Sequence, residues 1–242
     1  MCKLYDAHMA RLYAVLTGDL IGSSKSSPER LEATMDNIAT TAQFLAEYTG
    51  EKTRFTRYRG DGWQLTLSPA FYLRALALIL AKLKADRRTL STRIGIGIGS
   101  VDSFGTTDLR DAQGAAFVLS GRALDSLTRD HSLMLSAETL ANAIQEKRTE
   151  RLRGTIEWSD AAMLPMFGFI ARRWSAAQAE AMAIALENDH QTQATIAAKL
   201  GITRQALNIR LTGAGYGPIL AAIKLTERHF NDIIDEGAQD NA

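Results

Sequence analysis

Two aspartates, Asp19 and Asp61, each stand where a predicted β-strand meets a turn. Carboxylates held close together repel one another unless a cation lies between them. Ligand sets made of oxygen alone suit Mg²⁺ or Mn²⁺ bound together with a triphosphate. The pair is therefore a candidate ligand set for a divalent cation, provided that the fold brings the two side chains together. Taken alone, each aspartate also has a structural interpretation, because aspartates are common after strands and in Asp-Gly hairpin turns.

A short run of small residues follows the first aspartate and could hold phosphate. Small side chains let backbone N–H groups approach a phosphate, and the positive end of a following helix would assist them. The run lacks the glycine and lysine spacing of a P-loop, so that motif is excluded. The candidate phosphate-binding residues are Ile21, Gly22, Ser23 and Lys25.

The elements that must position these residues follow from hydrophobic periodicity. Runs of β-forming residues predict strands at 12–16, 53–58, 63–67, 92–99 and 132–135. Apolar residues at spacings of three and four predict helices at about 28–48, 69–86 and 115–127, and a shorter one ending near 148. The order is β-α-β-β-α-β-α-β, and its first six elements have the order of a ferredoxin-like split βαβ.

That topology determines where the two aspartates lie. The first strand runs beside the third in the antiparallel sense, so the end of the first meets the start of the third. We therefore expect Asp19 and Asp61 at the same edge of the sheet. The alternating glycines Gly95, Gly97 and Gly99 are better explained by a helix packed close to the sheet than by a ligand.

Composition limits the class of protein. The 242 residues are 46% hydrophobic and 23% charged, with a net charge of +1, which excludes a disordered chain and a global field for nucleic acid or membrane. The single cysteine, Cys2, excludes an intrachain disulfide framework and a Cys-rich zinc site, and the four scattered histidines show no ligand spacing. No apolar stretch is long enough for a membrane span, and the first residues lack the features of a signal peptide, so we expect a cytoplasmic protein.

The C-terminal part has helix-turn-helix spacing at 193–211. Gly201 would make the turn, and Thr203 would cap the second helix. The side chains that would face DNA are Thr203, Arg204, Gln205, Asn208 and Arg210. Seven basic and four acidic residues at 171–230 give a local charge of 7 − 4 = +3, which is small for a DNA-binding unit. A helical bundle used for dimerisation or docking remains the alternative.

The chain is thus expected to be α+β, with an all-α domain after the ferredoxin-like one. The predicted boundaries are residues 1–148 for the first domain, 149–174 for a connection, 175–235 for the helix-turn-helix domain and 236–242 for an acidic tail.

Four motifs carry a family resemblance: TGDLIGSS, RYRGDGW, RIGIGIGSV and DAQGAAFVLSGRAL. They resemble the catalytic palm of class III nucleotidyl cyclases and GGDEF-type proteins. The chain as a whole is more similar to the SatD family, which joins such a palm to a C-terminal helical unit that resembles DNA-binding domains. In this resemblance Asp19 and Asp61 match the metal-binding aspartates.

Further positions match the family pattern less closely. Arg57 matches the usual base-contacting lysine, and Asp111 matches the acid that recognises the base edge. Arg122 matches the arginine that stabilises charge on the reacting phosphate. Val118 stands where the family has asparagine, and Gly62 stands where GGDEF proteins have glutamate, which disfavours cyclic dinucleotide synthesis.

The resemblance implies a nucleoside triphosphate substrate, Mg²⁺ or Mn²⁺, and a homodimer whose sites take residues from both chains. It favours an NTP cyclase or a related nucleotidyltransferase, in which Asp19, Asp61 and Arg122 are catalytic. A DNA-binding regulator whose degenerate palm senses a nucleotide, and a pure interaction module, are the competing interpretations.

Overall fold

The structure is a computed structural model and describes residues 12–58, 60–128, 132–137, 154 and 158–239. Its strands are β1 (Leu12–Leu20), β2 (Arg54–Tyr58), β3 (Gly62–Leu67), β4 (Thr92–Ser100) and β5 (Leu133–Ala137). Its α-helices are α1 (Pro28–Thr49), α2 (Tyr72–Ala85), α3 (Ala115–Asp125), α5 (Leu164–Arg173), α6 (Ala176–Glu187), α7 (Gln193–Lys199), α8 (Arg204–Ala214) and α9 (Tyr216–Gln239). Short turns of other helix types are η1 (Ser23–Lys25), η2 (Pro69–Phe71), η3 (Leu109–Asp111) and η5 (Ser159–Met163).

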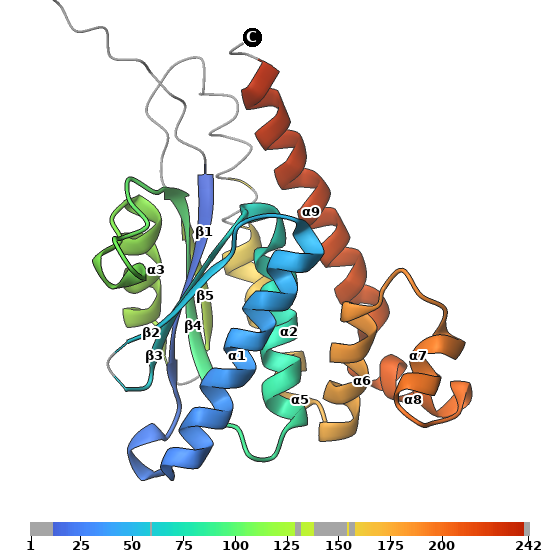
Figure 1. The fold of residues 1–242 in the computed structure, drawn as a ribbon. Coiled ribbons are helices and arrows are strands. Elements are labelled where there is room, and N and C mark those ends of the chain that lie inside the picture. Colours follow the sequence, from blue (N-terminus) through green and yellow to red (C-terminus); the bar gives the residue numbers. More distant parts are fainter. Residues whose placement is uncertain (1–11, 59, 129–131, 138–153, 155–157, 240–242) are drawn as a thin grey trace, which may run out of the picture.

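The five strands form one sheet in the order β2-β3-β1-β4-β5 (Figure 1). Strand β1 is antiparallel to both β3 and β4, whereas β4 and β5 are parallel. The predicted pairing of the first and third strands is therefore confirmed. The first strand is longer than predicted, because Thr17 to Leu20 also pair with β4.

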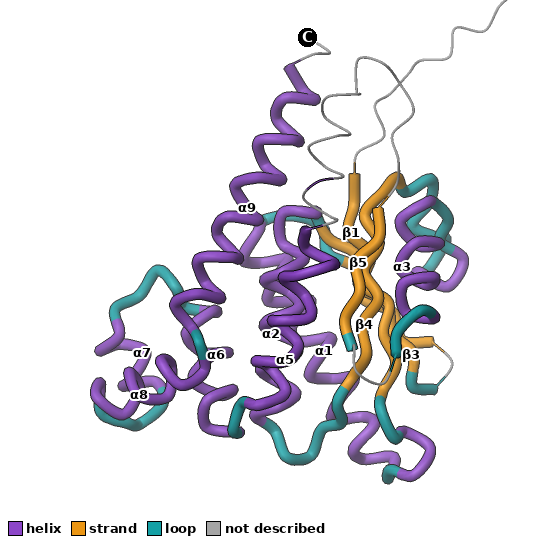
Figure 2. Tube along the Cα trace, turned by 180° about the vertical axis from the view of Figure 1, so that it is seen from behind, coloured by secondary structure: helices purple, strands orange, loops and turns teal. Residues whose placement is uncertain are grey.

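Helices cover both faces of the sheet. Figures 1 and 2 show α3 on one face, and α1 and α2 on the other. Along β1 the side chains alternate: Leu12, Ala14 and Leu16 join the core shared with α1 and α2. The Thr17 side chain points the other way and hydrogen-bonds the Ser120 hydroxyl of α3 at 2.7 Å.

Glycines on β4 let α3 approach the sheet closely. A Cβ atom at Gly97 would overlap the Ala116 carbonyl of α3, and one at Gly95 would overlap the Ser120 carbonyl. The close-packing interpretation is therefore confirmed for these two glycines. Their role is structural, since they leave room for helix backbone.

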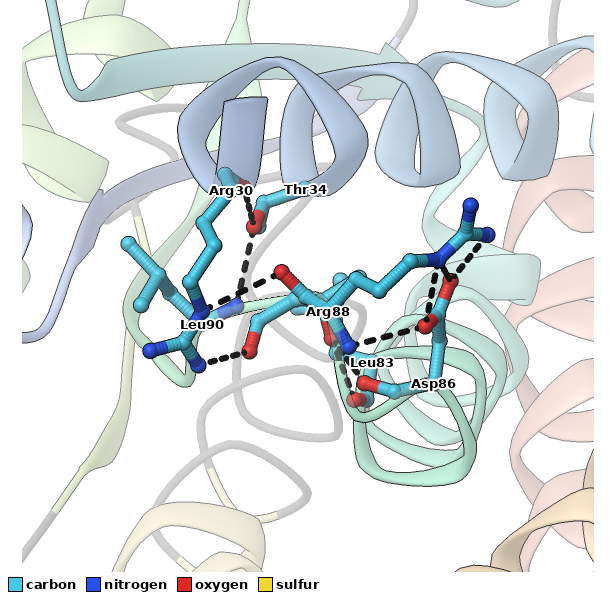
Figure 3. Close-up of polar contacts among 7 residues, drawn as sticks. Arg30, Thr34, Leu83, Asp86, Arg88 and Leu90 are labelled. Carbon is cyan, nitrogen blue, oxygen red and sulfur yellow. Dashed lines mark hydrogen bonds and ion pairs between the residues drawn. The ribbon is translucent and has the colours of Figure 1, made fainter. Parts of the chain in front are cut away.

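The loop before β4 is fixed to α1 (Figure 3). Arg30 donates through Nη2 to the Thr89 carbonyl at 2.8 Å, and the Leu90 amide donates to the Thr34 hydroxyl at 2.9 Å. The Ile21 amide donates to the Ser91 carbonyl at 2.8 Å. These bonds fix the start of β4 against the end of β1, where the first candidate aspartate lies.

The C-terminal helices share the core of the sheet. Buried residues of α5, α6 and α9, such as Phe167, Met182 and Ile223, belong to the same apolar cluster as Leu76 of α2. Helices α7 and α8 form a smaller cluster with α6 and project away from the sheet (Figure 1). No described helix is long and apolar enough to cross a bilayer.

Two predicted segments differ in the structure. Residues 149–174 were expected to be a connection, but they contain α5, which buries Leu164, Phe167 and Ala171. Met166 and Phe169 on the same helix are also apolar but exposed, so the sequence does not show the periodic apolar pattern from which a helix is predicted. The expected acidic tail begins inside α9, which continues to Gln239. The predicted helix ending near residue 148 lies outside the described residues.

Candidate functional site

Asp19 lies within β1 rather than after it. Its backbone is opposite Gly62 of β3 on one side and Arg93 of β4 on the other. Pairing on both sides explains why the strand continues through a charged residue. The Asp19 carboxylate accepts a hydrogen bond from Arg93 Nε at 2.9 Å, and its other oxygen pairs with Arg93 Nη2.

Asp61 occupies the turn between β2 and β3, directly before the residue that pairs with Asp19. Gly60 supports this turn with a φ of 77°, in the left-handed region that favours glycine. The Ser23 hydroxyl donates to Asp61 Oδ2, so the hairpin turn is tied to the segment that follows β1. The register thus places the two aspartates at the same edge of the sheet.

The donors at this edge fit a divalent cation of the Mg²⁺ type. They are hard oxygens: the Asp61 carboxylate, which accepts from the Ser23 hydroxyl, and the Asp19 carboxylate, which Arg93 engages. Among the described residues, no group of three or more His, Cys, Asp or Glu side chains could hold a metal alone. An ion here would complete its shell with water and phosphate, as Mg²⁺ commonly does at nucleotide sites.

The candidate phosphate segment is a separate turn and not the start of α1. Gly22 has a φ of 78° and precedes η1, whereas α1 begins later, at Pro28 after Ser27. The Ile21 amide is used by Ser91, and the Lys25 amide donates to the Gly22 carbonyl at 3.1 Å. The first helix starts at Pro28, as predicted, and the turn η1 lies between β1 and that helix. The backbone amides of this segment that are left to donate to a phosphate are those of Gly22, Ser23 and Ser24.

Arg57 and Asp111 both take part in local structure. Arg57 forms an ion pair with Glu32 of α1 at 2.6 Å, and its Nε donates to the Gly60 carbonyl at 2.9 Å. Asp111 accepts hydrogen bonds from the amide and hydroxyl of Thr106, which lower the pKa of its exposed carboxyl group. A base contact by either side chain would require these bonds to be exchanged.

Arg122 does not face the two aspartates of its own chain. Ser120 and Leu124 lie against Gly95 of the sheet, and Arg122 is about 200° around the helix from each of them. Its side chain is exposed, as is that of Val118 one turn earlier. These two residues form an outward stripe on α3.

A cavity of about 460 Å³ adjoins Asp19. Arg93, Ile21 and Gly22 contribute to its walls, as do Leu127 and Thr128, which follow α3. Its volume is in the range of small-molecule sites. Arg93 was not among the predicted site residues, because its role depends on the register between β1 and β4. A cross-strand charge pair is visible in the sequence only when that register is known.

The predicted recognition helix begins where expected. Thr203 caps α8 by accepting a hydrogen bond from the Ala206 amide at 3.1 Å, and Gly201 makes the preceding turn with a φ of 64°. Arg204, Gln205 and Asn208 are exposed. Arg210, by contrast, forms an ion pair with Glu180 of α6 at 3.1 Å.

No protein-family model matches this chain, and a search of curated proteins finds no match. Among solved structures, the chain is similar to the dimeric guanylyl cyclase domain of the RhoGC fusion protein from the aquatic fungus Blastocladiella emersonii. The identity is 19% and the TM-score 0.40, over 52% of this chain and 79% of that one. A bacterial light-regulated adenylyl cyclase aligns at 15% identity and a TM-score of 0.38, over 52% of this chain and 75% of that one.

The catalytic core of a rhodopsin-guanylyl cyclase with converted specificity, solved with ATPalphaS, aligns over the same share of this chain and 78% of its own. Its identity is 18% and its TM-score 0.42. At these TM-scores the likeness carries no argument about activity.

Proposed function

We propose that this chain binds a nucleoside triphosphate with Mg²⁺ or Mn²⁺ and acts as an NTP cyclase or a related nucleotidyltransferase. One observation carries the proposal: Asp19 pairs with the residue after Asp61, and Ser23 ties the Asp61 turn to the segment after β1. We further propose that residues 1–148 form a ferredoxin-like palm and that the chain is SatD-like. The motif resemblance described above supports this assignment.

The chain's own residues would divide the work of binding and reaction. Asp19 and Asp61 would hold the cation, and the amides of Gly22, Ser23 and Ser24 would donate to phosphate oxygens. When bound, the cation neutralises the triphosphate and lowers the pKa of a ribose hydroxyl. That hydroxyl would attack the α-phosphate in line, lose its proton to solvent and expel pyrophosphate.

Arg122 would act in the site of a second copy. Its outward position on α3 supports a homodimer in which each chain supplies the arginine that stabilises charge at the other chain's phosphate. Within one chain the site would remain without this group.

The test is to incubate the purified protein with each of the four NTPs and Mn²⁺ and to identify the products by mass spectrometry. We expect one NTP to yield a cyclic monophosphate and pyrophosphate. Asp61→Ala should abolish metal-dependent nucleotide binding in calorimetry, whereas Asp36→Asn, an exposed aspartate on α1, should not. Unchanged nucleotide affinity in Asp61→Ala would contradict the metal site.

A second candidate is a DNA-binding regulator that senses a nucleotide. It draws on Val118 in place of the family asparagine, and on the exposed Arg204, Gln205 and Asn208 of a capped helix. A nucleotide-bound protein that forms no product would favour it. In a gel shift on random duplex at low salt, Arg204→Ala together with Arg210→Ala should then remove binding, and binding that survives would exclude α8 as the recognition helix.

A further inference from the structure

Arg93 is bound to Asp19 and has no role in the reaction proposed above. The two residues lie opposite each other on β4 and β1. The guanidinium uses Nε and Nη2 to engage the two oxygens of the Asp19 carboxylate. The carboxylate that the proposed metal site needs is therefore already paired with a positive charge.

The side chains of this pair are partly exposed, whereas their backbones are paired within the sheet. Arg93 is 40% exposed and Asp19 29% exposed, and both line the same cavity as Ile21 and Gly22. The hydrogen bond to Asp19 is the main cause that raises the pKa of Arg93, and the charge of Asp125 on α3 makes a smaller contribution.

Arg93 and a divalent cation compete for the same oxygens. A guanidinium that donates in a fork to both oxygens of a carboxylate competes with a metal ion for those oxygens, and its positive charge repels a nearby divalent cation. Phosphate oxygens are equally good partners for that fork. A triphosphate in this cavity would offer them beside the Gly22 turn.

We propose that Arg93 closes the cation site of the nucleotide-free protein by occupying Asp19, and that a triphosphate opens it by drawing the guanidinium onto its phosphate oxygens. The inference rests on the proposed function and adds a regulation to it. Metal and nucleotide then bind with positive coupling, because each removes an obstacle to the other. The free protein avoids holding a divalent ion without substrate.

The test measures binding of Mn²⁺ alone, from the loss of the six-line EPR signal of the free ion. Wild-type protein should bind it weakly. Arg93→Gln should bind it at least about tenfold more tightly, because a competing positive charge is gone. Arg88→Gln is the matched control, since Arg88 makes a similar fork to Asp86 on an exposed loop, with Nη2 to Oδ2 at 2.8 Å (Figure 3). It should change nothing.

Two further variants keep the result interpretable. The tighter Mn²⁺ binding of Arg93→Gln should vanish in the double variant Asp19→Asn with Arg93→Gln, because the Asp19 carboxylate that binds the ion is then lost. Arg93→Lys retains the charge but not the fork, so it should show a smaller gain, and it serves if Arg93→Gln fails to fold. Equal Mn²⁺ affinity in wild type, Arg93→Gln and Arg93→Lys would overturn the inference.

Failure of the proposed function gives a different result. Repeating the titration with each NTP, with the Mn²⁺ bound by that NTP in the absence of protein subtracted, should tighten Mn²⁺ binding in the wild type by at least about tenfold and in Arg93→Gln by less. A wild type that binds no Mn²⁺ with any NTP would overturn the proposed function and the nucleotide part of this inference. The Mn²⁺-only comparison would still decide whether Arg93 blocks Asp19.

Discussion

Arg74 of α2 and Glu227 of α9 form an ion pair of 2.6 Å in which the arginine side chain is fully buried. The same guanidinium reaches Asp189 at 3.1 Å and donates to the Leu186 carbonyl at 3.1 Å. Its remaining face lies over the Tyr48 ring, 4.5 Å from the centroid. One cation thus connects α1 and α2 of the sheet domain to the C-terminal helices.

Removing that cation should destabilise the whole chain. Arg74→Met leaves the Asp189 and Glu227 carboxylates without their shared partner, and breaking a buried pair in this way costs about 3–5 kcal/mol. Urea unfolding followed by circular dichroism would measure the loss. Arg88→Met, which breaks the exposed pair with Asp86, should have a much smaller effect, because exposed ion pairs contribute little to stability. Equal effects of the two substitutions would contradict this account.

Two glycines should respond oppositely to alanine. Gly97→Ala drives a methyl group into the Ala116 carbonyl and should destabilise the protein by about 1–3 kcal/mol. Gly121→Ala meets nothing within 4 Å on α3 and should stabilise it by up to about 1 kcal/mol. Thermal unfolding of the two variants beside the wild type would check the opposite signs.

Alkaline pH should weaken the fold through Tyr72. Burial raises the pKa of its hydroxyl to about 12, and Ser159 opposes that shift by a smaller amount. Because the unfolded tyrosine ionises near pH 10, this contribution is fully present below pH 10 and is lost as pH rises toward 12, at about 1.4 kcal/mol per unit. Unfolding free energies at pH 9 to 11.5 should therefore fall more steeply in the wild type than in Tyr72→Phe. Parallel curves would refute the assignment.

Co-refolding two inactive variants should restore activity, because each proposed site takes residues from both chains of the dimer. Asp61→Ala and Arg122→Ala should each be inactive, because every site of either homodimer lacks one group. Co-refolded chains form mixed dimers with one intact site, so the mixture should reach about a quarter of wild-type activity. A mixture as inactive as its components would show that Arg122 acts in its own chain or not at all.

The arrangement of strands could be predicted because local signals agreed with one another. Strand alternation, the Gly60 turn and the Ser27-Pro28 helix start each restrict the chain independently. The end of β1 could not be predicted, because residues 17–19 are held extended by pairs on both sides and Leu20 by its pair with β4. Helix α5 was missed because Met166 and Phe169 add exposed apolar residues to its buried stripe.

The candidate site was partly predictable for a similar reason. Strand order alone brings Asp19 and Asp61 to the same edge. The partner of Asp19 depends on the one-residue register of β1 against β4, and a single step would move Arg93 to the other face. The ion pair between Arg210 and Glu180 depends on how α8 packs on α6, which helical periodicity does not determine.

Helices α6 and α9 bury Met182, Ile223 and Phe230 in the same apolar core as the helices that cover the sheet. A protein truncated before these helices should therefore fold poorly. A fragment that ends at residue 174 would expose the hydrophobic surface of α2 that these helices cover, and it would be expected to aggregate. Biochemical work on the sheet and the helices that cover it should therefore use all 242 residues.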